Sequence, residues 1–373
     1  MTRRVLFLIS DTGGGHRASA EALAEALQRL HGPAVASDIV DPFAEYAHWP
    51  LNHAPGAYLP LINRAGWLWQ TLWRLSAHPA SWRAARDLTT IWQSDRMHQL
   101  FADHPADLVV SVHPLLSQAP QRTLRARQPK TRTATVVTDL VSAPRMWYAP
   151  EVDLLIASCD EVGAAAQAAG VPPTRIRQLG LPIRLAFAEP PVSRVEARAR
   201  LGLADLPTAL VMSGGEGMGP VEQIVSALAA ALWDQPAQIV VICGRNMPLQ
   251  HRLAATKWPV PVTPLGFVAD IPRWMSAADC LVTKAGPGSI AEALACGLPM
   301  VLSSFVPGQE TGNISFVERH GAGVYRREPG EIAAQVRDWL AAPETAEAIR
   351  QRARRLARPT AALDIASALS ELL

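Results

Sequence analysis

Residues 5–30 read VLFLISDTGGGHRASAEALAEALQRL, an apolar run followed by three glycines and a helix-like stretch. The run at 5–9 suits a buried strand of a parallel sheet, and residues 18–30 repeat apolar side chains at helical spacing. A strand that enters a helix through glycines is typical of nucleotide-binding α/β domains, in which free amides at the helix start receive an anion. The stretch therefore predicts an α/β fold that starts with this strand.

Strand-like apolar runs alternate with helical segments along most of the remaining chain. The runs are 108–112, 134–138, 154–157, 209–212, 239–243, 280–283 and 300–303. Helices are predicted at 219–232 and 290–295, and residues 342–373 are also predicted to be helical. The sequence EPPV at 189–192 interrupts the alternation and suits a linker. The pattern predicts two doubly wound α/β domains, the first over residues 1–190.

The composition is that of a globular protein without a basic excess. The 373 residues are 49% hydrophobic and 18% charged, with 35 Lys and Arg against 33 Asp and Glu. This balance argues against a disordered chain and against nucleic acid as the main partner. No apolar run reaches the roughly 18 residues that a membrane-spanning helix needs. The four scattered cysteines suit free thiols in a reducing compartment, and DTGGGH stands where a signal peptide would have its cleavage site.

The three-glycine loop allows two interpretations. Gly13, Gly15 and Ala18 match the dinucleotide-binding pattern G-x-G-x-x-A, and Asp38 follows about 20 residues later, where the next strand is expected to end. Alone, this match would favour a dehydrogenase. His16 would crowd a pyrophosphate at this loop, whereas its imidazole could act as a general base. The alternative for His16 is a residue that merely caps the helix.

Three further motifs lie in the second half of the chain. SGGEGMGP at 213–220 follows a strand, and Pro220 is expected to open the next helix. In TKAGPGSIAE at 283–292, Ser289 is expected to cap a helix that faces a phosphate, and Glu292 either holds a ribose or only complements the helix dipole. PGQETGN at 307–313 suits a polyhydroxylated ligand. Since the second half has its own nucleotide site, the dehydrogenase interpretation fails.

A carboxylate-bound metal is not expected at the diphosphate, because the sequence contains no D-x-D triplet. Helix starts and arginines would then meet the charge of the leaving diphosphate. Neither a metal nor a cofactor is therefore predicted, and a sugar nucleotide would be a substrate.

The chain resembles monogalactosyldiacylglycerol synthases in eight motifs that keep their order. They are SDTGGGHRASAEAL, SVHPLLSQ, VVTDL, GLPIR, SGGEGMGP, ICGRN, TKAGPGSIAEALACGLP and PGQETGN. That family is grouped with bacterial diacylglycerol glucosyltransferases and, more distantly, with the enzyme that adds N-acetylglucosamine to lipid I. The resemblance implies a glycosyltransferase-B fold, with two Rossmann-like domains and the active cleft between them. It implies an acceptor and membrane domain at 1–190, a UDP-sugar domain at 191–352, and a final helix at 353–373 that packs back on the first domain.

The resemblance also implies roles for single residues. His16 would be the general base, and Asp139 is the next candidate if it is not. Glu292 would hold the ribose, and Gln309 and Glu310 would touch the sugar hydroxyls. The full set of expected donor contacts is Gly14, Gly15, Arg184, Ser213, Gly214, Gly215, Gly217, Arg245, Phe267, Lys284, Ala285, Gly286, Gly288, Ser289, Glu292, Gln309 and Glu310. Within this set Arg184 would face the diphosphate, and Arg245 and Phe267 would lie around the uracil.

Residues 49–92 differ from the rest of the chain in composition. Six of the 11 tryptophans lie there: Trp49, Trp67, Trp69, Trp73, Trp82 and Trp92. Arginines outnumber acids over 51–100, and Trp with Arg favours the membrane interface. The segment is expected to contact an anionic membrane surface. The alternative is a Trp-rich helical insert that packs on the domain.

The sequence thus predicts an inverting glycosyltransferase. It would move a hexose, with galactose favoured, from a UDP-sugar to diacylglycerol and form a β-glycoside. The alternatives are transfer of glucose, transfer to another lipid acceptor, and a non-catalytic protein that binds UDP-sugars. The expected location is the cytoplasm, at the inner face of the cell membrane.

Overall fold

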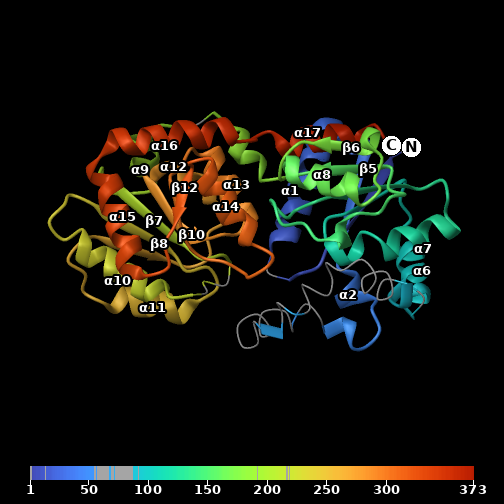
Figure 1. Ribbon diagram of the computed structural model, residues 1–373, viewed down its shortest axis with the longest axis horizontal. Helices are drawn as coiled ribbons and strands as arrows, with labels where there is room; N and C mark the ends of the chain where they lie inside the picture. Colours follow the sequence, from blue (N-terminus) through green and yellow to red (C-terminus); the bar gives the residue numbers. More distant parts are fainter. Residues whose placement is uncertain are drawn as a thin grey trace. The chain divides into compact units, whose positions relative to one another are not determined.

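The structure of the chain is a computed structural model (Figure 1). It describes residues 2–12, 14–53, 56, 67–68, 71, 87–90, 92–190, 192–215, 217 and 219–373. The chain forms two compact units. The first comprises Met1–Leu185, Pro307–Gln309 and Thr360–Leu373, and the second comprises Ala186–Val306 and Glu310–Pro359. Within the described residues, no helix has the length and apolarity needed to cross a bilayer.

The first unit is built on a parallel sheet in the order β2-β1-β3-β4-β5-β6. Its strands are β1 (Arg3–Leu8), β2 (Val35–Val40), β3 (Leu108–Ser111), β4 (Arg132–Val136), β5 (Leu154–Ala157) and β6 (Ile176–Gln178). Its α-helices are α1 (Gly15–His31), α2 (Pro42–Glu45), α6 (Ser94–Asp103), α7 (Ala119–Arg127), α8 (Asp160–Ala168) and α17 (Ala361–Ser370).

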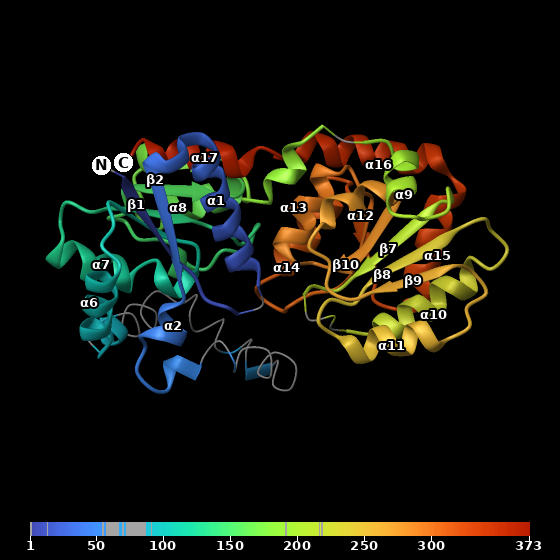
Figure 2. The same cartoon turned by 180° about the vertical axis from the view of Figure 1, so that it is seen from behind.

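Alternate side chains of β1 face two different cores. Val5 and Phe7 pack with α1 and α17, whereas Leu6 and Leu8 pack with α6 and α7. Figure 2 shows α1 beside β1 and β2, with α17 next to α1. Because both faces of the sheet are covered, the inner strands β3 and β5 are buried along their whole length.

The second unit has a parallel sheet in the order β12-β11-β10-β7-β8-β9. Its strands are β7 (Thr208–Met212), β8 (Gln238–Ile242), β9 (Val262–Leu265), β10 (Cys280–Lys284), β11 (Met300–Ser304) and β12 (Gly323–Tyr325). Its α-helices are α9 (Arg194–Arg200), α10 (Val221–Ala231), α11 (Met247–Ala255), α12 (Ile271–Ala277), α13 (Pro287–Ala295), α14 (Thr311–Arg319), α15 (Pro329–Ala341) and α16 (Pro343–Leu356). Side chains of α10, α11 and α15 share one core on the same face of this sheet.

The α/β fold and the apolar strands are confirmed. Each predicted strand lies within two residues of an observed one at both ends. The helix predicted at 18–30 begins earlier, at Gly15, so that His16 lies in its first turn and not in the loop. Pro220 precedes α10 as its N-cap and does not open it, because the helix begins at Val221.

Candidate active site

Three of the predicted motifs lie at the switch points of the two sheets. In the first sheet the order reverses between β1 and β3, and in the second between β7 and β10. Open α/β sheets bind ligands beyond the carboxyl ends of the strands at such points. His16 follows β1, and the two phosphate motifs at 213–220 and 283–292 follow β7 and β10.

The three-glycine loop ends at Gly14, which is the N-cap of α1 in a left-handed conformation, with φ of 81°. A Cβ at Gly14 or Gly15 would meet no atom within 4 Å, so the space beside both residues is open. Asp11 and Arg17 brace the loop with bonds of 2.7 and 2.8 Å, and the amide of Asp11 donates to Asp41. Gly13 lies outside the described residues.

His16 does not cap the helix; its ring turns toward the neighbouring strands. Nδ1 lies 2.7 Å from the carbonyl oxygen of Val112, directly after β3, and 2.9 Å from Thr138 Oγ1. A carbonyl oxygen cannot donate, so Nδ1 carries the proton of the neutral ring. Nε2 then holds the lone pair, which is the arrangement that a general base needs.

Burial keeps this imidazole neutral. It lowers the pKa of His16 from 6.5 to about 4, against smaller raising effects of the bond to Val112 and the charge of Asp11. The ring of His113 meets that of His16 edge-on, with centroids 4.6 Å apart, and Trp147 lies 6.4 Å away on a third segment. Burial also lowers the pKa of His113 well below 6.5.

Asp139, the second candidate for the base, is buried and contacts Trp147, which lies near His16. Its Oδ2 accepts a bond of 2.7 Å from Trp147 Nε1. Gln309, which belongs to the first unit, donates from Nε2 to Asp139 Oδ1 over 3.5 Å. The predicted contact of Gln309 with a sugar stays a prediction.

Asp38, the ribose acid of the dinucleotide-binding pattern, is not placed where that pattern needs it. Asp38 does not end its strand but pairs with Leu6 inside β2, two residues before Val40. Its Oδ2 accepts a bond of 3.0 Å from Arg4 Nη2, within the sheet. Asp38 therefore has a structural partner inside the sheet and does not serve the dinucleotide-binding pattern.

In the second unit, the loops after β7 and β8 touch backbone to backbone. A Cβ on Gly217 would lie 2.2 Å from the carbonyl of Cys243, and a Cβ on Gly244 would lie 2.2 Å from that of Gly215. Both glycines have positive φ, of 56° and 60°. Neither position accepts a side chain, and the amide of Arg245 closes the contact by donating to the Gly215 carbonyl at 2.8 Å.

Lys284 reaches over the glycines that line this space. Its Cε would lie 3.6 Å from a Cβ on Gly214, and its Nζ would lie 3.2 Å from a Cβ on Gly286. Nζ donates to Glu310 Oε1 at 2.5 Å, while Glu310 Oε2 accepts from the amide of Val306 at 2.8 Å. Lys284 is thus held at the start of α13 by a buried carboxylate. The predicted contact of Glu310 with a sugar stays a prediction.

Ser289 is not the cap of its helix. Gly286 is the N-cap and Pro287 is the first residue of α13, because proline has the φ of a first helical residue and lacks the N–H that would stay unpaired there. The free amides of the first turn thus start at Gly288 and Ser289. Gly288 has no atom within 4 Å of a Cβ position, so this end of α13 leaves room for an anion. Glu292 lies one turn further on.

Arg245 and Phe267 come together as expected for a base site. The guanidinium carbon lies 5.5 Å from the centre of the Phe267 ring, which is 61% exposed. An exposed aromatic face under a cation offers a stacking surface for a nucleobase. Arg184, in the first unit, is half-buried near the end of that unit's first segment.

Asn313 is a supporting residue that the motif analysis did not single out. Its Nδ2 donates to the carbonyl of Ala285 at 2.9 Å, and the amide of Ala285 donates to the carbonyl of Ser304 at 2.8 Å. Both sides of Ala285 are therefore fixed. The available signal in the sequence was the amide side chain of Asn313 at the end of PGQETGN.

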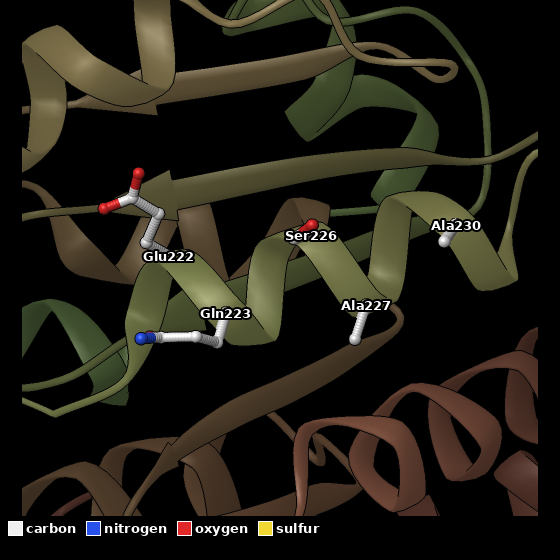
Figure 3. Close-up of a pocket in the computed structure, with 5 residues that line it drawn as sticks. All are labelled: Glu222, Gln223, Ser226, Ala227 and Ala230. Carbon is white, nitrogen blue, oxygen red and sulfur yellow. The ribbon is translucent and has the colours of Figure 1, made fainter.

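A hollow of about 570 Å³ runs along α10, away from these residues. Figure 3 shows that its lining residues all project from α10: Glu222, Gln223, Ser226, Ala227 and Ala230. Arg252 Nε donates to Glu222 at 2.9 Å. None of the five lining residues is a candidate site residue. Within the described part of the chain, no cluster of His, Cys, Asp or Glu has the geometry of a metal site.

Comparison with known proteins places the chain in a family. Residues 16–183 match the family model for monogalactosyldiacylglycerol (MGDG) synthase, and residues 203–356 match that for glycosyl transferases group 1. Monogalactosyldiacylglycerol synthase 1, chloroplastic, of Arabidopsis thaliana is 38% identical over 99% of this chain and 71% of its own length. The chain belongs to the monogalactosyldiacylglycerol synthase family.

Other similar proteins support this placement and the fold. A probable monogalactosyldiacylglycerol synthase 2 of Oryza sativa subsp. indica is 40% identical over 99% of this chain and 81% of its own length. MurG of Acinetobacter baumannii superposes with a TM-score of 0.65 at 14% identity over 99% of both chains. Anabaena Alr3699/HepE, solved with UDP and glucose, gives a TM-score of 0.57 at 16% identity over 98% of this chain and 99% of its own. The likeness to these structures shows that this monogalactosyldiacylglycerol synthase relative has the glycosyltransferase-B fold, which consists of two Rossmann-like domains.

Proposed function

We propose that the chain transfers galactose from UDP-galactose to diacylglycerol with inversion, and that His16 is the base. Membership of the monogalactosyldiacylglycerol synthase family supports the transferase activity and its lipid product. The hydrogen bond from His16 Nδ1 to Val112 is the observation that carries the assignment of the base, because it leaves Nε2 unprotonated.

The reaction is a single displacement. His16 Nε2 takes the proton of the acceptor hydroxyl while its oxygen bonds to the anomeric carbon. The bond from that carbon to the diphosphate breaks on the opposite face, and UDP leaves with the electron pair. An α-linked donor thereby gives a β-glycoside. Because the pKa of His16 is lowered to about 4, the ring is in its neutral form at neutral pH and can accept the proton.

The second unit is the proposed donor domain. Lys284, the amides at the start of α13 and the open glycines after β7 would meet the diphosphate, with Arg184 as a further cation. Arg245 and Phe267 would hold the uracil, and Glu292 the ribose. The first unit supplies the acceptor side.

We propose that the enzyme works as a peripheral protein on an anionic membrane, at the inner face of the cell membrane. Several large apolar side chains between residues 49 and 92 are exposed: Trp49 and Trp67 by 73%, Leu88 by 69% and Trp92 by 43%. Such rings favour the headgroup zone where diacylglycerol resides. Trp69, Trp73 and Trp82 lie outside the described residues. All four cysteines are free, as suits a reducing compartment.

The test is incubation with UDP-galactose and UDP-glucose in separate reactions, with diacylglycerol in anionic liposomes, followed by analysis of the lipid. A β-galactosyl lipid from the first donor is the expected result. A glucosyl product alone would assign the other hexose. Binding of UDP without any lipid product from either donor would identify a non-catalytic UDP-sugar-binding protein and overturn the proposal.

A further inference from the structure

Thr138 contacts the same imidazole nitrogen as the carbonyl of Val112. His16 Nδ1 lies 2.9 Å from Thr138 Oγ1 and 2.7 Å from Val112 O, and the Thr138 hydroxyl lies 3.3 Å from the same carbonyl, to which it donates. The three groups form a closed triangle at the carboxyl ends of β3 and β4. Thr138 is only 6% exposed, so its hydroxyl has little access to competing water.

A carboxylate commonly orients a basic histidine, and the triad of serine proteases is an example. Here the carboxylate that follows Thr138 in the sequence, Asp139, accepts a bond from Trp147. Asp11 influences His16 through its charge. In the part of the chain that the structure describes, the partners of His16 Nδ1 are one carbonyl and one hydroxyl, both uncharged.

We infer that Thr138 is a positioning residue for the reaction, which together with the Val112 carbonyl holds His16 with Nδ1 protonated and Nε2 directed at the acceptor. The inference rests on the proposed function, because it requires His16 to be the base. It explains how the ring is oriented without a carboxylate partner. The hydroxyl is suited to the task because it accepts from Nδ1–H and donates to the carbonyl at the same time.

The geometry predicts what each member contributes. The carbonyl selects the tautomer, because a lone pair on Nδ1 would face its oxygen at 2.7 Å. Thr138 fixes the rotation of the ring about its Cβ–Cγ bond, because a second acceptor from the next strand leaves one orientation that satisfies both. A freely turning ring would present Nε2 to the acceptor only part of the time, and turnover would fall without a change in donor binding.

The test compares Thr138→Val, which keeps the shape and removes the hydroxyl, with Thr138→Ser, which keeps the hydroxyl. We expect T138V to lower kcat by roughly 3–10-fold, the value of one neutral hydrogen bond. The KM for UDP-galactose, the affinity for UDP and the melting temperature should stay at wild-type values. T138S should restore kcat.

Two results would overturn the inference. One is wild-type kcat in T138V, and the other is an equal loss in T138V and T138S. If T138V does not fold, Thr138→Ala serves in its place against T138S, with the same expectations. If His16→Gln retains full turnover, the proposed base is wrong, and that failure is distinct from a failure of the Thr138 assignment.

The tautomer is also measurable without turnover. In protein labelled with ¹⁵N-histidine, the His16 signals are identified by their loss in H16Q. At neutral pH they should be those of an Nδ1-protonated ring. An Nε2-protonated ring in the wild-type protein would contradict the hydrogen-bond triangle and overturn the inference, whatever the kinetic result.

Discussion

The ring of His113 meets that of His16 edge-on, with an angle of 73° between their planes. His113 is buried and His16 is half-buried. His16 follows β1 and His113 follows β3, at the carboxyl ends of two neighbouring strands. The contact places a second titratable ring beside the proposed base. Burial lowers the pKa of His113, and the charge of a protonated His16 lowers it further.

Stability should accordingly fall in mild acid. The pKa of His16 is about 4 in the folded protein and 6.5 when unfolded, and that of His113 is lowered in the same direction. The unfolded chain therefore binds more protons as the pH falls through 6.5, and stability is lost progressively toward pH 4. Urea unfolding at pH 7.0, 6.0 and 5.0 measures this loss. His113→Phe keeps a ring at the contact and should flatten the decline; an unchanged slope would contradict a buried, neutral His113.

Activity should depend on pH differently. Because His16 is already neutral above about pH 5, its protonation should not limit kcat/KM between pH 5.5 and 8. Burial sets the low pKa of His16, against the smaller raising effects of the hydrogen bond to Val112 and the charge of Asp11. A pH–rate profile of the wild-type enzyme is the measurement, taken where urea curves show it folded. An acid limb centred near 6.5 would show that His16 is not desolvated in the working enzyme.

Removal of the base should separate chemistry from donor binding. His16→Ala is expected to lower kcat by about 10²–10⁴-fold, because general-base catalysis is lost. The affinity for UDP should stay within about twofold, since Lys284 and the glycines after β7 belong to the second unit. Calorimetry with UDP and a lipid-product assay give the two values. Near-wild-type turnover would transfer the role of base to another residue, with Asp139 next to test.

Donor affinity should depend on Lys284 and Glu292. Loss of a charged hydrogen bond predicts that Lys284→Met weakens UDP binding by about 10- to 100-fold. Glu292→Ala should weaken it through the ribose. Lys257→Met is the matched control, because that lysine lies on the same unit and is exposed at the end of α11. Equal UDP affinity in all three variants would remove both residues from the donor site.

The membrane contact should follow the exposed tryptophans of the first unit. Trp49, Trp67 and Trp92 replaced together by Ala should reduce co-sedimentation with anionic vesicles by roughly tenfold or more, since each ring contributes on the order of 1 kcal/mol at the interface. Trp233→Ala is the control, because this residue is 68% exposed on the second unit. Salt should weaken binding of the wild type without abolishing it. Sedimentation of the triple variant equal to that of wild type would move the contact elsewhere.

The strands and glycine loops were predictable because their physical causes are local. A buried parallel strand must be apolar along its length, as β3 and β8 are, and a loop that packs on another backbone needs a glycine, as at Gly217. The edge strands β6 and β12, with sequences IRQ and GVY, are too short and too mixed to give a pattern. β9 contains a proline, and its sequence VTPL therefore resembles that of a loop.

The sequence was enough to select His16 as a candidate, but it did not reveal the contacts that hold the candidate residues in place. His16 stood out as a basic side chain beside glycines. Its principal partner, the carbonyl of Val112, is a backbone group 96 residues away, and no side-chain pattern marks it. The link from Asn313 to Ala285 is of the same kind. Contacts of this type depend on the order of the strands in the sheet, because that order determines which distant segments become neighbours.

The packing of α17 on α1 also constrains how the molecule can be made. The core of the first unit includes Ala362, Ile365 and Leu369, which follow the second unit in the sequence. The first unit therefore cannot complete its core until the second unit has been synthesised, and the part of α1 that packs on α17 stays uncovered until then. A chain cut after residue 359 would keep the whole second unit and would leave the first unit without α17, one helix of its core.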